Sequence, residues 1–123
     1  MISAEKKRRL IDKLKIELGS DILDYLADPD ITEIMLNPDG FVWTEGFKSG
    51  LVKRFELDPR KGESIIGTIA DYSVTTVTRS APVISGILPI NECRFEGMIP
   101  PVVSRPSFTI RKRAVQVLSL IHI

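Results

Sequence analysis

The sequence predicts an α+β domain in which helices pack on a mostly antiparallel sheet. Apolar residues recur at helical spacing between residues 10 and 26 and again between residues 65 and 70. Elsewhere, short runs rich in β-branched and aromatic residues are separated by Pro, Gly, Asn and Asp, which favour turns. The chain has 123 residues, of which 43% are hydrophobic and 27% charged, and this balance is typical of one folded domain.

The N-terminal segment predicts two consecutive helices. In residues 3–18, leucines follow one another at four-residue spacing and basic residues fill the other faces, with Ser3 as the N-cap. Gly19 is expected to end this helix, and residues 20–27 are expected to form a shorter one. The basic run at residues 6–9 is interpreted as a solvated helix face, because acidic residues share the same helix.

The next part of the chain predicts three strands followed by a helix. The strands are residues 32–36, 41–44 and 51–57, and Asn37-Pro38-Asp39-Gly40 forms the turn between the first two. The helix begins with Pro in its favoured first turn and extends to about Tyr72, with isoleucines at helical spacing. From Val74 onward the sequence again favours strands, with candidates at residues 83–89, 94–99 and 107–113.

Composition and motifs exclude several classes of protein. The sequence has one cysteine, Cys93, and one histidine, His122, which are too few to form an internal disulfide or a structural zinc site. The net charge of +1 is too small to attract the whole protein electrostatically to nucleic acid or to a membrane surface. No apolar run is as long as the core of a signal peptide or a membrane-spanning helix. We find no catalytic constellation and no G-x-x-x-x-G-K-[ST] phosphate loop. We therefore expect a cytoplasmic protein with no catalytic residue of its own.

Arginines in the C-terminal strands are the candidate binding residues. Arg94 precedes the Pro100-Pro101 pair, and alternation along the last strand places Arg111 and Arg113 opposite its core-facing side chains. Guanidinium forks match phosphate oxygens, so converging arginines would bind a polyphosphate or a nucleic-acid backbone. The alternative interpretation is that these arginines protect an edge strand or form salt bridges with nearby glutamates at 92 and 96.

Two other polar or aromatic groups receive structural interpretations. Asp28 and Asp30 flank a proline and are expected to cap a solvated turn. Phe41 and Trp43 share one side of their strand and are expected to pack in a core or an interface, since no basic pattern accompanies them.

Three motifs in order resemble the N-terminal domain of TrbB-type conjugative transfer ATPases. They are the segment 30–40 (DITEIMLNPDG), the segment 82–103 with its PVI, RFEG and PPVV stretches, and the segment 108–113 (FTIRKR). The resemblance extends from about residue 7 to residue 117. It implies a PAS-like N-terminal domain that precedes a RecA-like motor domain. The family forms homo-hexameric rings on the cytoplasmic face of the bacterial inner membrane and powers conjugation or type IV secretion machinery.

The resemblance also assigns roles to the arginines. In the superfamily, nucleotide binds between the two domains, and arginines of the N-terminal domain reach its phosphates. The matching positions are Arg94 and Arg111, with Arg113 as a weaker candidate. ATP and Mg would be bound mainly by the motor domain, so we expect residues 1–117 to lack ATPase activity and any metal site, and we do not expect direct binding of nucleic acid.

The last six residues depart from the family pattern. Residues 118–123 (LSLIHI) are also what the end of a transposon-based sequencing adapter would encode, so they are expected to be a non-native tail. Two alternatives to the ATPase hypothesis remain at this point. One is a stand-alone PAS-like ligand- or protein-binding module, and the other is a nucleic-acid-binding domain that uses Arg94, Arg111, Lys112 and Arg113.

Overall fold

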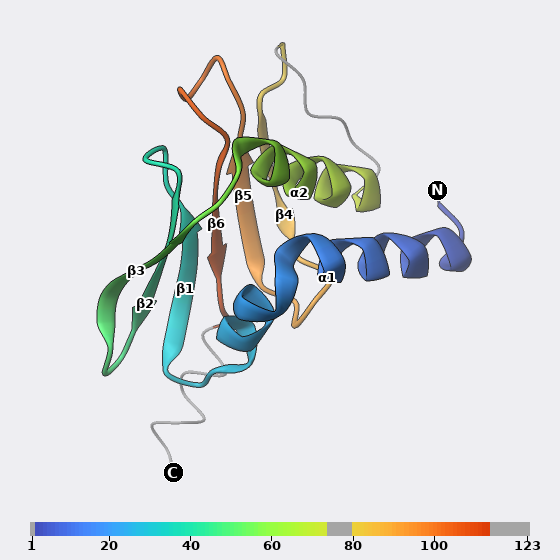
Figure 1. Cartoon of the computed structure of the whole chain (residues 1–123). Coiled ribbons are helices and arrows are strands. Elements are labelled where there is room, and N and C mark those ends of the chain that lie inside the picture. The colour runs from blue at the N-terminus through green and yellow to red at the C-terminus, as the bar shows by residue number, and fades with distance from the viewer. Residues whose placement is uncertain (1, 74–79, 114–123) are drawn as a thin grey trace.

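The structure, a computed structural model, describes residues 2–73 and 80–113. In this part of the chain, two helices lie on one face of a six-stranded antiparallel sheet (Figure 1), which confirms the predicted α+β class. The strand expected directly after Val74 and the tail expected from Leu118 fall on residues outside these ranges. No helix within the described ranges has the length and apolarity needed to cross a membrane.

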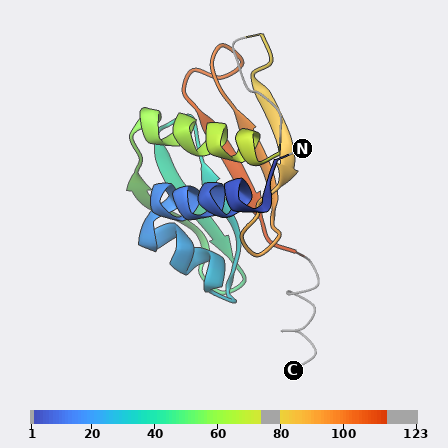
Figure 2. The same cartoon turned by 90° about the vertical axis from the view of Figure 1, so that its right-hand side faces the viewer.

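Helix α1 (Ala4–Ala27) joins the two predicted N-terminal helices into one bent element. The Ser3 hydroxyl accepts a hydrogen bond from the Lys6 N–H at 3.1 Å, which confirms the predicted cap. At Gly19 the backbone takes φ 79° and ψ 168°, and the two segments run in different directions on either side of it (Figure 2). A side chain would strain this conformation, so glycine permits the bend that keeps both segments on the sheet.

Helix α2 (Pro59–Tyr72) lies beside α1. The Asp58 carboxylate caps it by accepting from the Arg60 N–H at 2.8 Å. Between the helices, the Glu17 carboxylate accepts from the buried Thr68 hydroxyl at 2.6 Å and from the Ser64 hydroxyl. These polar contacts join the two helices above their shared apolar face.

The sheet has the order β3-β2-β1-β6-β5-β4, so strands from the two ends of the chain meet in its centre. The strands are β1 (Ile31–Leu36), β2 (Phe41–Gly46), β3 (Gly50–Glu56), β4 (Val83–Ile87), β5 (Arg94–Met98) and β6 (Ser107–Arg111). The predicted extension of the last strand to residue 113 is wrong. Regular pairing stops at Arg111, and the Lys112 ammonium turns inward to donate to the Asp28 carbonyl at 2.5 Å.

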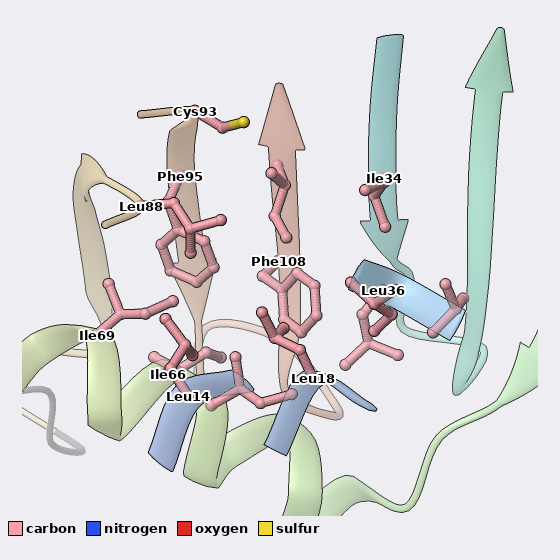
Figure 3. Packing of buried hydrophobic residues seen from close by; sticks show 14 of the residues in the cluster. Leu14, Leu18, Ile34, Leu36, Ile66, Ile69, Leu88, Cys93, Phe95 and Phe108 are labelled. Carbon is pink, nitrogen blue, oxygen red and sulfur yellow. The ribbon is translucent and has the colours of Figure 1, made fainter. Parts of the chain in front are cut away.

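The hydrophobic core lies between the helices and the inner face of the sheet. The rings of Phe95 on β5 and Phe108 on β6 pack with centroids 5.7 Å apart, and α2 contributes Ile66 and Ile69 to the same cluster (Figure 3). Ile110 on β6 is also fully buried. Because neighbouring residues of a strand face opposite ways, Phe95, Phe108 and Ile110 are each flanked by a residue that points to the other, open face.

Candidate functional site

The open face of the sheet brings the two predicted arginines together. β5 and β6 pair with Arg94 directly opposite Arg111, and β6 and β1 pair with Arg111 directly opposite Glu33. Facing strands lie about 4.8 Å apart. The three side chains therefore form one row across the centre of the sheet, although 78 positions separate Arg111 from Glu33.

The two arginines of this row differ in their partners. The Arg111 guanidinium lies 3.5 Å from a Glu33 carboxylate oxygen, and the side chains are 66% and 22% exposed. This pair is long and solvated, so it contributes at most about 1 kcal/mol. Arg94 has no ion-pair partner among residues 2–73 and 80–113. Within these ranges, the Arg111 guanidinium is thus weakly held, and no carboxylate holds that of Arg94.

The row borders an open pocket of about 290 Å³. Besides the two arginines and Glu33, its walls include Ser85 of β4, Glu96 of β5 and Thr109 of β6. The Ser85 hydroxyl lies 3.4 Å from the Glu96 carboxylate. Two guanidinium groups, two carboxylates and two hydroxyls thus border a space on the surface of the sheet that is large enough for a small polyanion.

The electrostatics of the arginine pair favour an anion. Like charges directly opposite each other on neighbouring strands destabilise a sheet. Placing an anion between them converts this repulsion into two charge-assisted attractions. The arrangement can therefore bind phosphate-type oxygens.

Arg113 lies outside this pocket. It follows the end of β6, and its guanidinium donates to the Glu92 carboxylate at 2.9 Å, with the side chains 47% and 70% exposed. Glu92 is in the turn between β4 and β5, where it has φ 50°. This contact matches the alternative interpretation of a salt bridge with Glu92, and in this structure Arg113 does not join Arg111 in the row.

Lys112 and Cys93 are both buried, and each donates to a backbone carbonyl, Lys112 to that of Asp28 and Cys93 to that of Asn91. Burial lowers the pKa of the Lys112 ammonium, although the nearby Cys93, Asp28 and Asp30 act in the opposite direction. Burial also raises the pKa of the Cys93 thiol. A protonated thiol inside the core is not a reactive nucleophile, so Cys93 has a packing role.

Of the other groups that the sequence singled out, Asp30 stabilises a turn as expected, whereas Phe41 and Trp43 lie outside the hydrophobic core. The Asp30 carboxylate accepts from the Lys48 N–H at 2.6 Å, and this bond is the main cause that lowers its pKa. Phe41 and Trp43 lie half-buried on the open face of β2, with the Lys53 ammonium 4.0 Å from the centre of the Phe41 ring. In the described ranges, no three His, Cys, Asp or Glu side chains gather in a metal-binding group.

Sequence reasoning missed Glu33 as a member of the site. Its position in the segment 30–40 gave no chemical signal, because a single acidic residue in a strand is common. Alternation along the strand would have placed it on the open face, but only the pairing of β1 with β6 brings it to Arg111. The same holds for Ser85 and Thr109, which reach the pocket through strand order.

Comparisons with known proteins agree with this fold. The chain is 44% identical over 112 residues to a probable conjugal transfer protein TrbB of Sinorhizobium fredii, a match that covers 91% of this chain and 34% of that protein. It is 33% identical over 104 residues to the type IV secretion system protein VirB11 of Bartonella henselae, covering 80% of this chain and 28% of the relative. The chain thus spans about a third of the length of these relatives. It matches no protein-family model.

A solved structure with the same fold is the VirB11 ATPase of the Brucella suis type IV secretion system in complex with sulphate. It superposes with a TM-score of 0.77 and 28% identity, over 89% of this chain and 33% of that one. The fold and these similarities define the chain as matching the N-terminal domain of a secretion ATPase. It belongs to the family of the TrbB conjugal transfer proteins and their VirB11 relatives.

Proposed function

We propose that the chain is the N-terminal part of an ATPase that powers conjugative DNA transfer or type IV secretion. Within it, Arg94 and Arg111 would bind the phosphates of ATP in a cleft shared with a motor domain. The observation that carries this proposal is their direct cross-strand pairing beside an open pocket. Two repelling guanidinium groups in register are an arrangement that a bound polyphosphate would stabilise.

The geometry suits a sensing role better than a chemical one. Both arginines come from adjacent central strands, so a rigid sheet fixes the spacing between their backbones. Guanidinium groups are charged at every accessible pH and can each bind two phosphate oxygens. When ATP is bound, its terminal phosphate would thus attract the sheet toward the motor domain, and loss of that phosphate would weaken the attraction. Mg and the remaining nucleotide contacts are assigned to the motor domain.

Similarity to the VirB11 ATPase extends the proposal to assembly and location. That relative was crystallised with sulphate, an anion that resembles phosphate in shape and in its oxygens. We propose that the longer protein forms a homo-hexamer at the cytoplasmic face of the inner membrane, beside the transfer or secretion machinery. Arg113 is retained in this proposal as a secondary phosphate ligand, which would have to leave Glu92 to act.

The domain boundary belongs to the same proposal. Residues 1–117 are assigned to the N-terminal domain, and residues 118–123 to a non-native tail. Sequencing an unfragmented genomic amplicon across codon 117 tests both assignments. The proposal predicts different codons from position 118 and a G-x-x-x-x-G-K-[ST] motif downstream, whereas finding LSLIHI in the genome contradicts the assignment of the tail.

Turnover by the longer protein tests the role of the arginines. We expect Arg94→Ala and Arg111→Ala each to lower ATP turnover about tenfold or more, because each removes a guanidinium from the phosphates. Arg60→Ala is the matched control, since Arg60 is 92% exposed on α2 and pairs with Asp58. We also expect no ATP turnover by residues 1–117. Unchanged turnover in both pocket variants, with the unfolding midpoint preserved, contradicts the proposal.

A further inference from the structure

Two carboxylates, Glu33 and Glu96, line the arginine pocket, and among the described residues only Glu33 forms an ion pair with one of its arginines. Glu33 approaches Arg111 from β1 on one side of the row, while Arg94 lies on the other side. The Glu33 side chain is 22% exposed, and the Arg111 side chain is 66% exposed, so the carboxylate is the more deeply placed of the two. A ligand that arrives from solvent therefore meets an arginine already directed toward a carboxylate in the floor of the pocket.

We propose that Glu33 competes with the incoming phosphate for Arg111 and sets the affinity of the site. This inference rests on the proposed function, because it assumes that a polyphosphate binds at the arginine pair. With the pocket empty, the carboxylate neutralises part of the repulsion between Arg111 and Arg94. When a polyphosphate binds, Arg111 exchanges the carboxylate for phosphate oxygens, and Glu33 keeps its charge in the floor of the pocket without this partner.

The contact geometry suits a competitor that can be displaced. The 3.5 Å separation in this pair is long compared with the ~2.8 Å of a strong charge-assisted bond, so a phosphate can outcompete it. The charge that remains on Glu33 then repels the bound anion at short range. Both effects weaken polyphosphate binding. A weakly charged anion would therefore not displace Glu33 from Arg111, whereas a nucleoside triphosphate or inorganic tripolyphosphate would.

The same row supplies a matched control. Glu45 on β2 is paired with Glu33 and is exposed on the open face, one strand further from Arg111. Two strand spacings place it about 10 Å from Arg111, close to the screening length in physiological salt. Glu45→Gln therefore removes the same charge from the same face without removing the contact with Arg111.

Binding of inorganic tripolyphosphate to the chain, followed by NMR titration or calorimetry, tests the inference. We expect Glu33→Gln to raise the affinity by about 3–10-fold and Glu45→Gln to change it by less than about 2-fold. Glu33→Asp, which keeps the charge, should remain close to the wild-type affinity. A residue that merely supported the structure would lower the affinity when replaced, so a gain identifies competition.

Two further variants separate the possible failures. In an Arg111→Ala background, Glu33→Gln should give no gain, because the competition acts through that arginine. If Arg111→Ala binds tripolyphosphate as tightly as the wild type, the proposed phosphate site itself is wrong. If Arg111→Ala weakens binding but Glu33→Gln leaves it unchanged or weaker, the site stands and the competition is overturned. If neither the wild type nor Glu33→Gln binds tripolyphosphate, the proposed competition is also overturned.

Discussion

The helix-covered face of the sheet and its open face share the same strands but carry opposite chemistry. Along β6, Phe108 and Ile110 are buried against the helices, whereas Thr109 and Arg111 line the pocket on the other side. The covered face removes apolar surface from water and supplies stability. The open face keeps like charges together, which does not favour folding. Alternate residues of one strand thus contribute to stability on one face and to the proposed binding site on the other.

The largest expected difference between the faces is in the free energy of unfolding. Phe108→Ala removes a ring that is 2% exposed and packs on Phe95, so it should destabilise the domain by about 3–5 kcal/mol. Arg111→Ala, three positions further along the same strand and on the other face, should change stability by less than about 1 kcal/mol. Urea unfolding of the two variants measures both values. Similar losses would mean that the open face also carries the fold.

Adding one methyl group beneath α2 should change the free energy of unfolding by a smaller amount. A Cβ at Gly97 would lie 2.9 Å from the Phe95 ring and 3.1 Å from Ile66, so Gly97→Ala should destabilise by about 1–3 kcal/mol. Gly67 in α2 has no neighbour within 4 Å of such a Cβ, so Gly67→Ala should stabilise by up to about 1 kcal/mol through helix propensity. Thermal unfolding of the two variants measures whether each change in stability is a loss or a gain. A stabilising Gly97→Ala would show that the covered face has unused space.

A pH series examines the polar end of the covered face. Burial lowers the pKa of folded Lys112 below its unfolded value of about 10.4. Between these two values the unfolded state binds more protons, so stability rises with pH as the penalty for the buried charge disappears. The wild type should therefore gain stability relative to Lys112→Met between neutral pH and about pH 10. Parallel curves from urea unfolding would mean that Lys112 is not effectively buried.

The sequence predicted the elements well because each depends on local pattern. The cap at Ser3, the break at Gly19 and the alternation at Phe108 and Ile110 follow from residue type and spacing. The order of strands does not, since the pairing of β1 with β6 joins segments distant in the chain. This is why Arg94 and Arg111 could be chosen from the sequence while their contact, and the place of Glu33 beside them, could not.

The end of β6 shows a second limit of local pattern. Alternation placed Arg113 on the same face as Arg111, but it assumes that the strand continues. The structure ends the regular pairing at Arg111, after which Arg113 pairs with Glu92 in a turn. At this point the buried Lys112 ammonium donates to the Asp28 carbonyl, and regular strand pairing does not continue. The sequence alone gives no sign of such a tertiary contact.

The most direct test of the central claim is to map where a polyphosphate binds. In a titration of the chain with inorganic tripolyphosphate, we predict that the largest amide NMR shifts occur at Glu33, Arg94, Thr109 and Arg111. Shifts concentrated at the basic run 6–9 of α1, or spread evenly over all lysines and arginines, would show non-specific attraction. That result would contradict the claim that the open face of this sheet carries a phosphate site.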